Sequence, residues 1–229
     1  MTGRRRAVWI GAGLVAAALV WIGAPYALRH VRFFRVREIE LVGLRNLAPD
    51  AVLAALRLDS TASAFDDLSA PAERVRRLHG VSDARVQRRL PGALRVVVRE
   101  VEPAAFVPGP HGMVVVDAGG RPLPFDPARA GLDLPIAATA DSGVVGVLAL
   151  MQAVEPPLFG EVTAARSYGR GDVLVEWGAR RVLLRRDAGP EVIRAVVLVA
   201  QDLAARGRPY VELDARYAGQ VVVRRRRST

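Results

Sequence analysis

The sequence predicts an α+β protein with three parts. These are a single N-terminal transmembrane helix, a small domain with the order strand, helix, helix, strand, strand, and a β-rich domain with one long helix. Three observations lead to this fold class. Residues 7–28 form an uncharged apolar run, and short segments of alternating apolar and polar residues recur from residue 33 onward. A Pro- and Gly-rich stretch at residues 102–112 separates two groups of such segments.

The apolar run at residues 7–28 predicts a transmembrane helix that follows a cytoplasmic tail at residues 1–6. A helix of this length spans about 33 Å, enough for a hydrocarbon core of about 30 Å. Trp9 lies at one end of the run and Trp21 at the other, where amphipathic rings favour the membrane interface. A cleaved signal peptide is the alternative, but its apolar stretch would be shorter, about 7–15 residues. Arginines flank the run on both sides, so their count does not choose an orientation.

The first domain is predicted from two short helices and three strands. The last two strands form a hairpin about the Pro91-Gly92 turn. Ser69 is expected to cap the second helix, because a serine oxygen can accept from the first free backbone amides. The elements are a strand at Phe33–Val42, a helix that begins at Pro49, a second helix that Gly80 ends, and strands at Ser82–Gln87 and Leu94–Arg99.

The hairpin carries arginines on one face only. Leu94, Val96 and Val98 alternate with Arg95, Val97 and Arg99, which predicts a half-buried strand with a solvated outer face. A nucleic-acid surface is the alternative, but it would interleave aromatic side chains with the basic ones. None lies between Arg85 and Val101, and the arginines of the whole chain are spread from Arg4 to Arg227. We therefore expect no nucleic-acid binding.

The second domain is predicted to contain two helices and several strands. The long helix is expected at Pro190–Arg206, where Pro190 suits a first helical position and apolar residues recur on one side. "GRGD" at residues 169–172 is interpreted as a hairpin turn rather than an adhesion motif. The other expected elements are a short helix at Val144–Val154, strands at Val162–Tyr168, Val173–Trp177 and Arg181–Arg186, and two final strands about a Tyr-Ala-Gly turn.

The composition points to binding rather than catalysis. The chain has 229 residues, a net charge of +10 and no cysteine, and all 33 basic residues are arginine. The absence of cysteine excludes disulfides, thiolate metal sites and cysteine nucleophiles. His30, His79 and His111 are too scattered to predict a metal site, and no Gly-x-Ser-x-Gly or phosphate-binding loop occurs. We expect no enzyme activity, no cofactor and no metal, and a partner with an acidic surface.

The segments "FRVREIELVGLRNL", "VSDARVQRRLPGALRVVVREVEPAAF" and "VELDARYAGQVVVR" together resemble the FtsQ/DivIB family of bacterial cell-division proteins. "FRVREIELVGLRNL" is similar to the opening strand of the family's POTRA domain, and "VSDARVQRRLPGALRVVVREVEPAAF" to its final hairpin. Within the hairpin, Arg99, Glu100 and Pro103 match the family's Arg-Glu-x-x-Pro ending. "VELDARYAGQVVVR" is similar to the terminal strands of the family's β domain. The resemblance implies a POTRA domain at residues 33–102, a β domain at 103–224 and a basic tail at 225–229.

The resemblance implies a bitopic scaffold protein of the division machinery, with its N-terminus in the cytoplasm. Its two domains would lie outside the cytoplasmic (inner) membrane, at the division septum. Its implied partners are the FtsB–FtsL pair at the C-terminal domain and proteins such as FtsK at the POTRA domain. Alternatives are a POTRA protein of another membrane assembly or secretion system, which would normally carry a β-barrel, and an anchored enzyme, which would need a polar cluster in a pocket.

The candidate binding site is the last strand and the turn before it. Because the chain ends there, this strand is expected at a sheet edge, where a partner strand can add through backbone hydrogen bonds. Val221 and Val223 would share one face of the strand. By matching the family motif, Arg216 and Tyr217 are the side chains expected to contact the partner; a turn tyrosine packed on its own sheet is the alternative for Tyr217. The predicted partner-binding residues are Arg216, Tyr217, Gly219, Gln220, Val221, Val222 and Val223.

Overall fold

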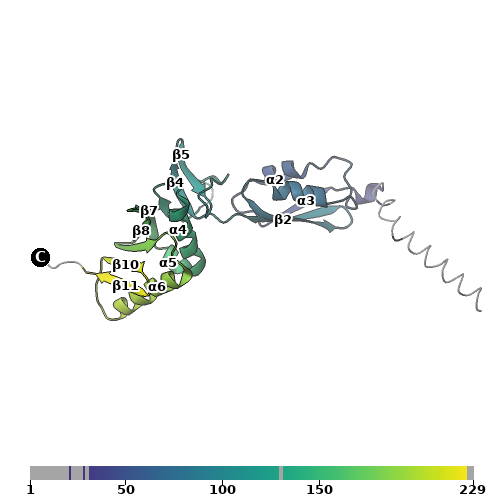
Figure 1. The fold of residues 1–229 in the computed structure, drawn as a ribbon. Helices are drawn as coiled ribbons and strands as arrows, with labels where there is room; N and C mark the ends of the chain where they lie inside the picture. Colours follow the sequence, from purple (N-terminus) through teal and green to yellow (C-terminus); the bar gives the residue numbers. More distant parts are fainter. Residues whose placement is uncertain (1–20, 22–27, 29–30, 129–130, 226–229) are drawn as a thin grey trace, which may run out of the picture. The chain divides into compact units, whose positions relative to one another are not determined.

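The computed structural model describes residues 21, 28, 31–128 and 131–225 of the chain. These residues divide into two compact units, at residues 1–100 and 101–229 (Figure 1). The first unit is a sheet with two helices on one face, and the second is a larger sheet that packs with three helices.

The first unit follows the order strand, helix, helix, strand, strand after a short 3-10 turn. Its sheet has the order β1-β3-β2, so β3, the last strand of this unit along the chain, lies in the middle. β1 pairs with β3 in parallel, and β2 pairs with β3 antiparallel as a hairpin. The elements are η1 (Arg32–Phe34), β1 (Glu38–Val42), α2 (Pro49–Leu56), α3 (Ser69–Arg76), β2 (Val81–Arg89) and β3 (Ala93–Glu100).

The two helices cover the apolar face of this sheet. Leu94 and Val96 of β3 are fully buried, as are Val52 of α2 and Val75 of α3. On the other face the arginines pair with acids within the sheet. Glu40 accepts from Arg95 at 2.9 Å and from Arg89 at 2.8 Å. The expected charged outer face is therefore confirmed.

Two local predictions in the first unit are wrong. β1 begins at Glu38 and not at Phe33, because the ring of Phe34 packs edge-on against Phe65 and the Phe34 carbonyl accepts from the Ala64 amide. Ser69 is the first residue of α3 and caps nothing. Instead, Asp67 accepts from both the backbone amide and the hydroxyl of Ser69, at 2.9 and 2.7 Å.

The second unit is an eight-stranded mixed sheet in the order β11-β10-β9-β8-β7-β6-β4-β5. Three of its strand pairs are parallel: β10 with β9, β7 with β6, and β6 with β4. Its strands are β4 (Ala105–Gly109), β5 (Gly112–Val116), β6 (Ile136–Ala137), β7 (Val162–Tyr168), β8 (Asp172–Trp177), β9 (Arg180–Arg185), β10 (Glu212–Tyr217) and β11 (Gln220–Arg224). Its helices are α4 (Ser142–Val154), α5 (Pro156–Phe159) and α6 (Pro190–Ala205).

All three helices of this unit pack into one core with the sheet. Leu148 of α4, Phe159 of α5 and Ile193 of α6 are buried there with strand residues such as Leu184 and Leu213. α4 begins at a cap that the sequence did not reveal. The Asp141 carboxylate accepts from the Gly143 amide at 2.8 Å and is held by Arg186. Burial alone would raise the pKa of the Asp141 carboxyl, but the hydrogen bond from the Gly143 amide and the Arg186 guanidinium together lower it.

The predicted fold class needs correction on two points. Among the described residues no helix is both long and apolar enough to cross a bilayer. The transmembrane helix predicted at residues 7–28 falls outside the described residues except for Trp21 and Leu28. The second unit carries two helices of substantial length, 13 and 16 residues, so the helix predicted as short at Val144–Val154 is nearly as long as the one predicted as long. A sheet of eight strands exposes more apolar surface than one helix covers, which gives a reason for the second.

Candidate functional site

The C-terminal hairpin of β10 and β11 carries all seven predicted site residues. Tyr217 pairs with Gln220 across the tight Ala218-Gly219 turn. Gly219 has a φ of +71°, a left-handed backbone conformation that glycine adopts without steric cost. An irregularity in the register lies between Asp214 and Tyr217, just before the turn. The hairpin therefore brings the predicted residues together on one ribbon.

β11 is an edge strand whose outer side is open. It pairs with β10 as its single strand neighbour, and the Val211 amide just before β10 also donates to the Arg224 carbonyl on that same side, at 3.0 Å. The opposite edge of the same sheet differs, because the loop after β5 folds back on that strand. There the Leu123 amide donates to the Val115 carbonyl at 2.8 Å, and Pro122 bridges Val116. An open row of backbone groups is what a partner strand needs in order to pair with a sheet.

The side chains of β11 alternate between the core and solvent. Val221 and Val223 pack against the core of the second unit, while Gln220 and Val222 are exposed. Val222 leaves 42% of its surface accessible. The predicted sharing of faces is confirmed, and one face of the strand is already used for folding. Only the edge and the outer face remain for a partner.

Arg216 is fixed by two carboxylates. Its guanidinium donates to Asp214 through Nε at 2.8 Å and Nη2 at 2.7 Å, and to Asp172 through Nη1 at 2.8 Å. Its guanidinium carbon also lies 5.8 Å from the centre of the Tyr168 ring. These bonds raise the pKa of the Arg216 guanidinium, Asp214 contributing more than Asp172. We call Arg216, Asp214 and Asp172 the charge clamp.

The acids of this outer face are more buried than their flanking arginines. Asp214 is only 1% exposed, and hydrogen bonds from Arg216 lower the pKa of its carboxyl despite the cost of burial. The next acid along β10, Glu212, is 6% exposed and lies between Arg181 of β9 and Arg224 of β11, at 3.5 and 3.3 Å. Sequence reasoning missed these acids as members of the site. Their alternation with Leu213 and Ala215 on β10 is the signal that could have placed them on one face.

The Tyr217 side chain is exposed, whereas the Arg216 side chain is bonded to two carboxylates. Its side chain is 55% exposed, at the end of β10. It borders a hollow of about 380 Å³ between the hairpin turn and the segment that runs from β9 into α6. Arg185 and Asp187 form part of the wall and bond to each other at 2.8 Å. An exposed aromatic ring beside a hollow can anchor a partner side chain.

Glu100 of the Arg-Glu-x-x-Pro ending has a structural role in the first unit. Glu100 accepts from the backbone amides of Arg45, Asn46 and Leu47 at 2.8–3.0 Å, and from the side-chain amide of Asn46. A single carboxylate thereby holds the loop that leads into α2. Across the described part of the chain, no group of three or more His, Asp or Glu side chains is placed to hold a metal ion.

Comparisons with known proteins agree with this architecture. Residues 34–100 match the family model for the POTRA domain, FtsQ-type. The first unit is therefore similar to FtsQ-type POTRA domains over nearly its whole described length. The predicted resemblance to the FtsQ/DivIB family is confirmed, because relatives named "Cell division protein FtsQ" come from several bacteria.

The similarity to these FtsQ proteins extends beyond the POTRA domain. The chain is 30% identical to FtsQ of Mycobacterium tuberculosis over 155 residues, which cover 65% of this chain and 48% of that protein. It is 28% identical to FtsQ of Cereibacter sphaeroides over 198 residues, 83% of this chain and 63% of that protein. With FtsQ of Rhodothermus marinus it shares 37% identity over 92 residues, 40% of this chain and 31% of that protein. The chain thus spans about half the length of the first of these relatives.

Proposed function

We propose that this chain is a non-enzymatic scaffold of bacterial cell division, which acts at the division site in association with the membrane. The supporting observations are the FtsQ-type POTRA domain and the relatives named as cell-division proteins. A POTRA protein of another membrane assembly is the alternative prediction, and the family-model match does not favour it.

The observation that carries the proposed mechanism is the open edge of β11. A partner segment in extended conformation adds there as a ninth strand and bonds to the outer backbone groups of Gln220–Arg224. The charge clamp holds β10 in place behind that edge, so little conformational entropy is lost when the partner binds. Tyr217 and its hollow receive one side chain of the incoming strand.

The proposed partners are FtsB- and FtsL-like proteins at this edge, and an FtsK-like protein at the POTRA domain. Arg224 on the edge strand β11 and Arg181 on β9 are both exposed. Acidic residues beside the pairing segment of the incoming strand would therefore be favoured. The FtsK-like partner of the POTRA domain is proposed from the family resemblance alone.

A fluorescent fusion of the full chain, followed through division, tests the proposed function. The fusion should accumulate at the septum, and a variant that lacks residues 221–229 should accumulate less because its partner edge is gone. A uniform signal throughout the cycle for the intact chain would contradict a role in division.

A further inference from the structure

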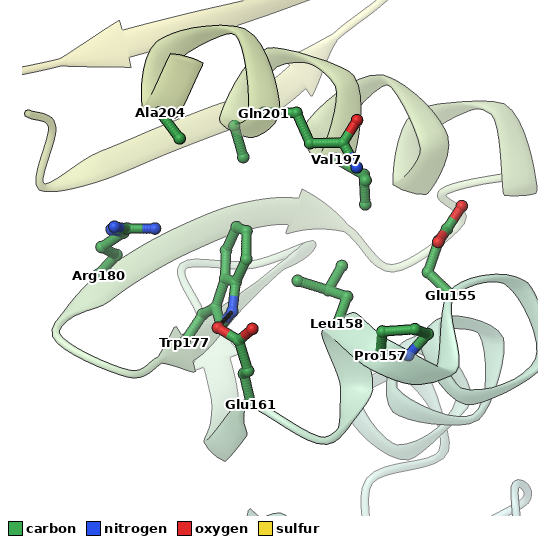
Figure 2. Close-up of a pocket in the computed structure, with 10 residues that line it drawn as sticks. Glu155, Pro157, Leu158, Glu161, Trp177, Arg180, Val197, Gln201 and Ala204 are labelled. Carbon is green, nitrogen blue, oxygen red and sulfur yellow. Dashed lines mark hydrogen bonds between the residues drawn. The ribbon is translucent and has the colours of Figure 1, made fainter. Parts of the chain in front are cut away.

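A groove lies between α6 and the α5 side of the second unit, away from the hairpin described above. Its volume is about 300 Å³. Figure 2 shows Val197 and Ala204 of α6 on one side, facing Leu158 and Trp177 on the other. Leu158 and Trp177 are buried, at 5% and 8% exposure, and form an apolar floor. An open groove with such a floor accepts an apolar side chain from outside.

Arg180 stands at one end of this groove in a fixed position. Its Nη1 donates to the Tyr210 hydroxyl at 3.3 Å, and its guanidinium carbon lies 4.8 Å from the centre of the Tyr210 ring. The centre of the Trp177 ring lies 5.8 Å from the same carbon, and this ring is itself held by a 2.7 Å hydrogen bond from its Nε1 to Glu161. Most of the Arg180 donors remain available to a ligand, because an arginine has five N–H groups.

Arg180 also lines a second hollow, of about 580 Å³, next to the groove. Arg208 and Arg225 line this hollow with it, and its lining contains no Asp or Glu. Arg208 and Arg225 are exposed, and neither forms an ion pair with any residue in the described ranges. Three guanidinium groups around one hollow without a carboxylate attract anionic groups strongly.

The far end of the groove has the opposite sign. Figure 2 shows Glu155 at the end away from Arg180. An occupant that runs along the groove therefore meets Glu155 and then the apolar floor, where the Glu161 carboxylate is bonded to Trp177. Beyond the floor it meets three guanidinium groups.

We propose that this groove and the adjoining hollow form a second docking surface, for a short segment of a partner protein. The segment carries a large apolar side chain over Trp177 and Leu158, followed by one or more Asp or Glu residues over Arg180, Arg208 and Arg225. Charge complementarity and the single shared arginine argue for one continuous occupant. A nucleic-acid strand fits less well, because the Trp177 and Tyr210 rings are buried and Glu155 would repel its backbone.

This surface lies at the end of the hairpin opposite to Tyr217, where Arg225 follows β11, and it extends the proposed function to a second partner contact. The hollow lies where β10 begins, at Tyr210 and Val211, whereas Tyr217 ends the same strand. Val211 and Tyr217 are six steps apart along the chain, which is about 20 Å in a strand. One partner can therefore occupy each end.

The test is a selection from a phage-displayed library of random dodecapeptides against the full chain. We expect enriched peptides to combine a large apolar residue with a neighbouring Asp or Glu. Synthetic copies should bind at least about tenfold more weakly to the double variant Arg208→Glu/Arg225→Glu and should weaken further with salt. The matched control Arg45→Glu/Arg170→Glu makes the same charge change at exposed positions elsewhere, and should alter the affinity by less than about twofold.

Two further variants locate the bound peptide. Binding should change the tryptophan fluorescence of the full chain, and Trp177→Phe should abolish that change. Tyr217→Ala should leave peptide affinity intact. The inference is overturned if no peptide is enriched, if the enriched peptides lack carboxylates, if both double variants bind equally, or if Tyr217→Ala weakens binding as much as Arg208→Glu/Arg225→Glu does.

Discussion

Arg216 and Tyr217 are neighbours in the chain with opposite situations in the fold. The Arg216 side chain is 24% exposed and bonded to two carboxylates, while Tyr217 is 55% exposed beside a hollow. Both were predicted as partner contacts. The tyrosine ring is exposed and so available for that role, which stays a prediction, whereas the donors of Arg216 are largely used within the sheet. We therefore expect the two residues to respond differently to mutation.

Tyr217→Ala should weaken binding of the FtsB/FtsL-like partner without unfolding the chain. Loss of an exposed aromatic anchor costs about 2 kcal/mol, which is a roughly 30-fold increase in Kd. Pull-down and titration of the partner measure this, with thermal unfolding as the check on the fold. Tyr217→Phe keeps the ring and should retain most of the affinity. Unchanged binding by Tyr217→Ala would show that the ring packs only on its own sheet.

Arg216→Ala should destabilise the second unit. It would leave the Asp214 carboxylate, 1% exposed, without its main partner, and removal of one member of a buried ion pair costs on the order of 3 kcal/mol. Urea unfolding of the full chain measures the loss. Arg170→Ala, at an exposed arginine in the turn before β8, is the control and should change stability by less than about 0.5 kcal/mol. A stable Arg216→Ala chain with weakened partner binding would instead make Arg216 a contact residue.

The charge clamp also predicts how stability depends on pH. Hydrogen bonds from Arg216 hold the pKa of Asp214 below its ordinary value of 3.8, so the unfolded chain binds this proton first as the pH falls. The stabilisation is complete well above pH 3.8 and is lost as the pH drops through that value toward the lower pKa of the folded state. Asp214→Asn should therefore be less stable than the wild type at pH 7, with a difference that narrows below about pH 4. Urea unfolding from pH 7 to pH 3 measures it, and a constant difference would contradict the assignment.

The sequence shows which residues lie in the hairpin but not how they are bonded. Tyr217 and the β11 valines could be predicted because their pattern is local. The clamp could not, because Arg216 and Asp172 are 44 positions apart and meet only when β8, β9 and β10 assemble. Similarly, Glu100 was noted as a motif residue, while its bonds to the loop at Arg45–Leu47 depend on long-range packing.

At the scale of single elements, β11 is the part of the fold that the proposed function needs most. Deletion of residues 221–229 should abolish partner binding, since it removes the docking edge itself. It also uncovers the core that Val221 and Val223 help to cover, so some loss of stability is expected. Co-purification with the partner is the measurement. Deletion of residues 226–229 alone is the matched control and should leave binding intact; equal loss in both deletions would assign binding to the basic tail.

Most strands and helices could be predicted from local patterns, with errors at their ends. The strand predicted at Val162–Tyr168 has those bounds in the structure, and the helix predicted at Pro190–Arg206 ends one residue earlier. The start of β1 and the cap of α3 were wrong, because contacts from the loop that contains Phe65 and Asp67 decide both. β6 has only two residues and leaves no pattern to detect.

At the scale of the whole molecule, the order of the strands is what local patterns could not provide. Hairpins such as β2–β3 and β10–β11 follow from their short turns. The parallel pairs β1–β3 and β9–β10 join segments separated by helices, and they place β3 inside one sheet and β11 at the edge of the other. The edge position of β11, on which the proposed function depends, was expected only because the chain ends there.

Site-specific photo-cross-linking tests most directly whether a partner strand adds to β11. A photoreactive residue at Val222, exposed on β11, should cross-link to the FtsB- or FtsL-like partner in dividing cells. The same residue at Met113, 38% exposed on the opposite edge strand β5, should not. Cross-linking from both positions alike, from Met113 alone, or from neither would contradict strand addition at the C-terminal edge.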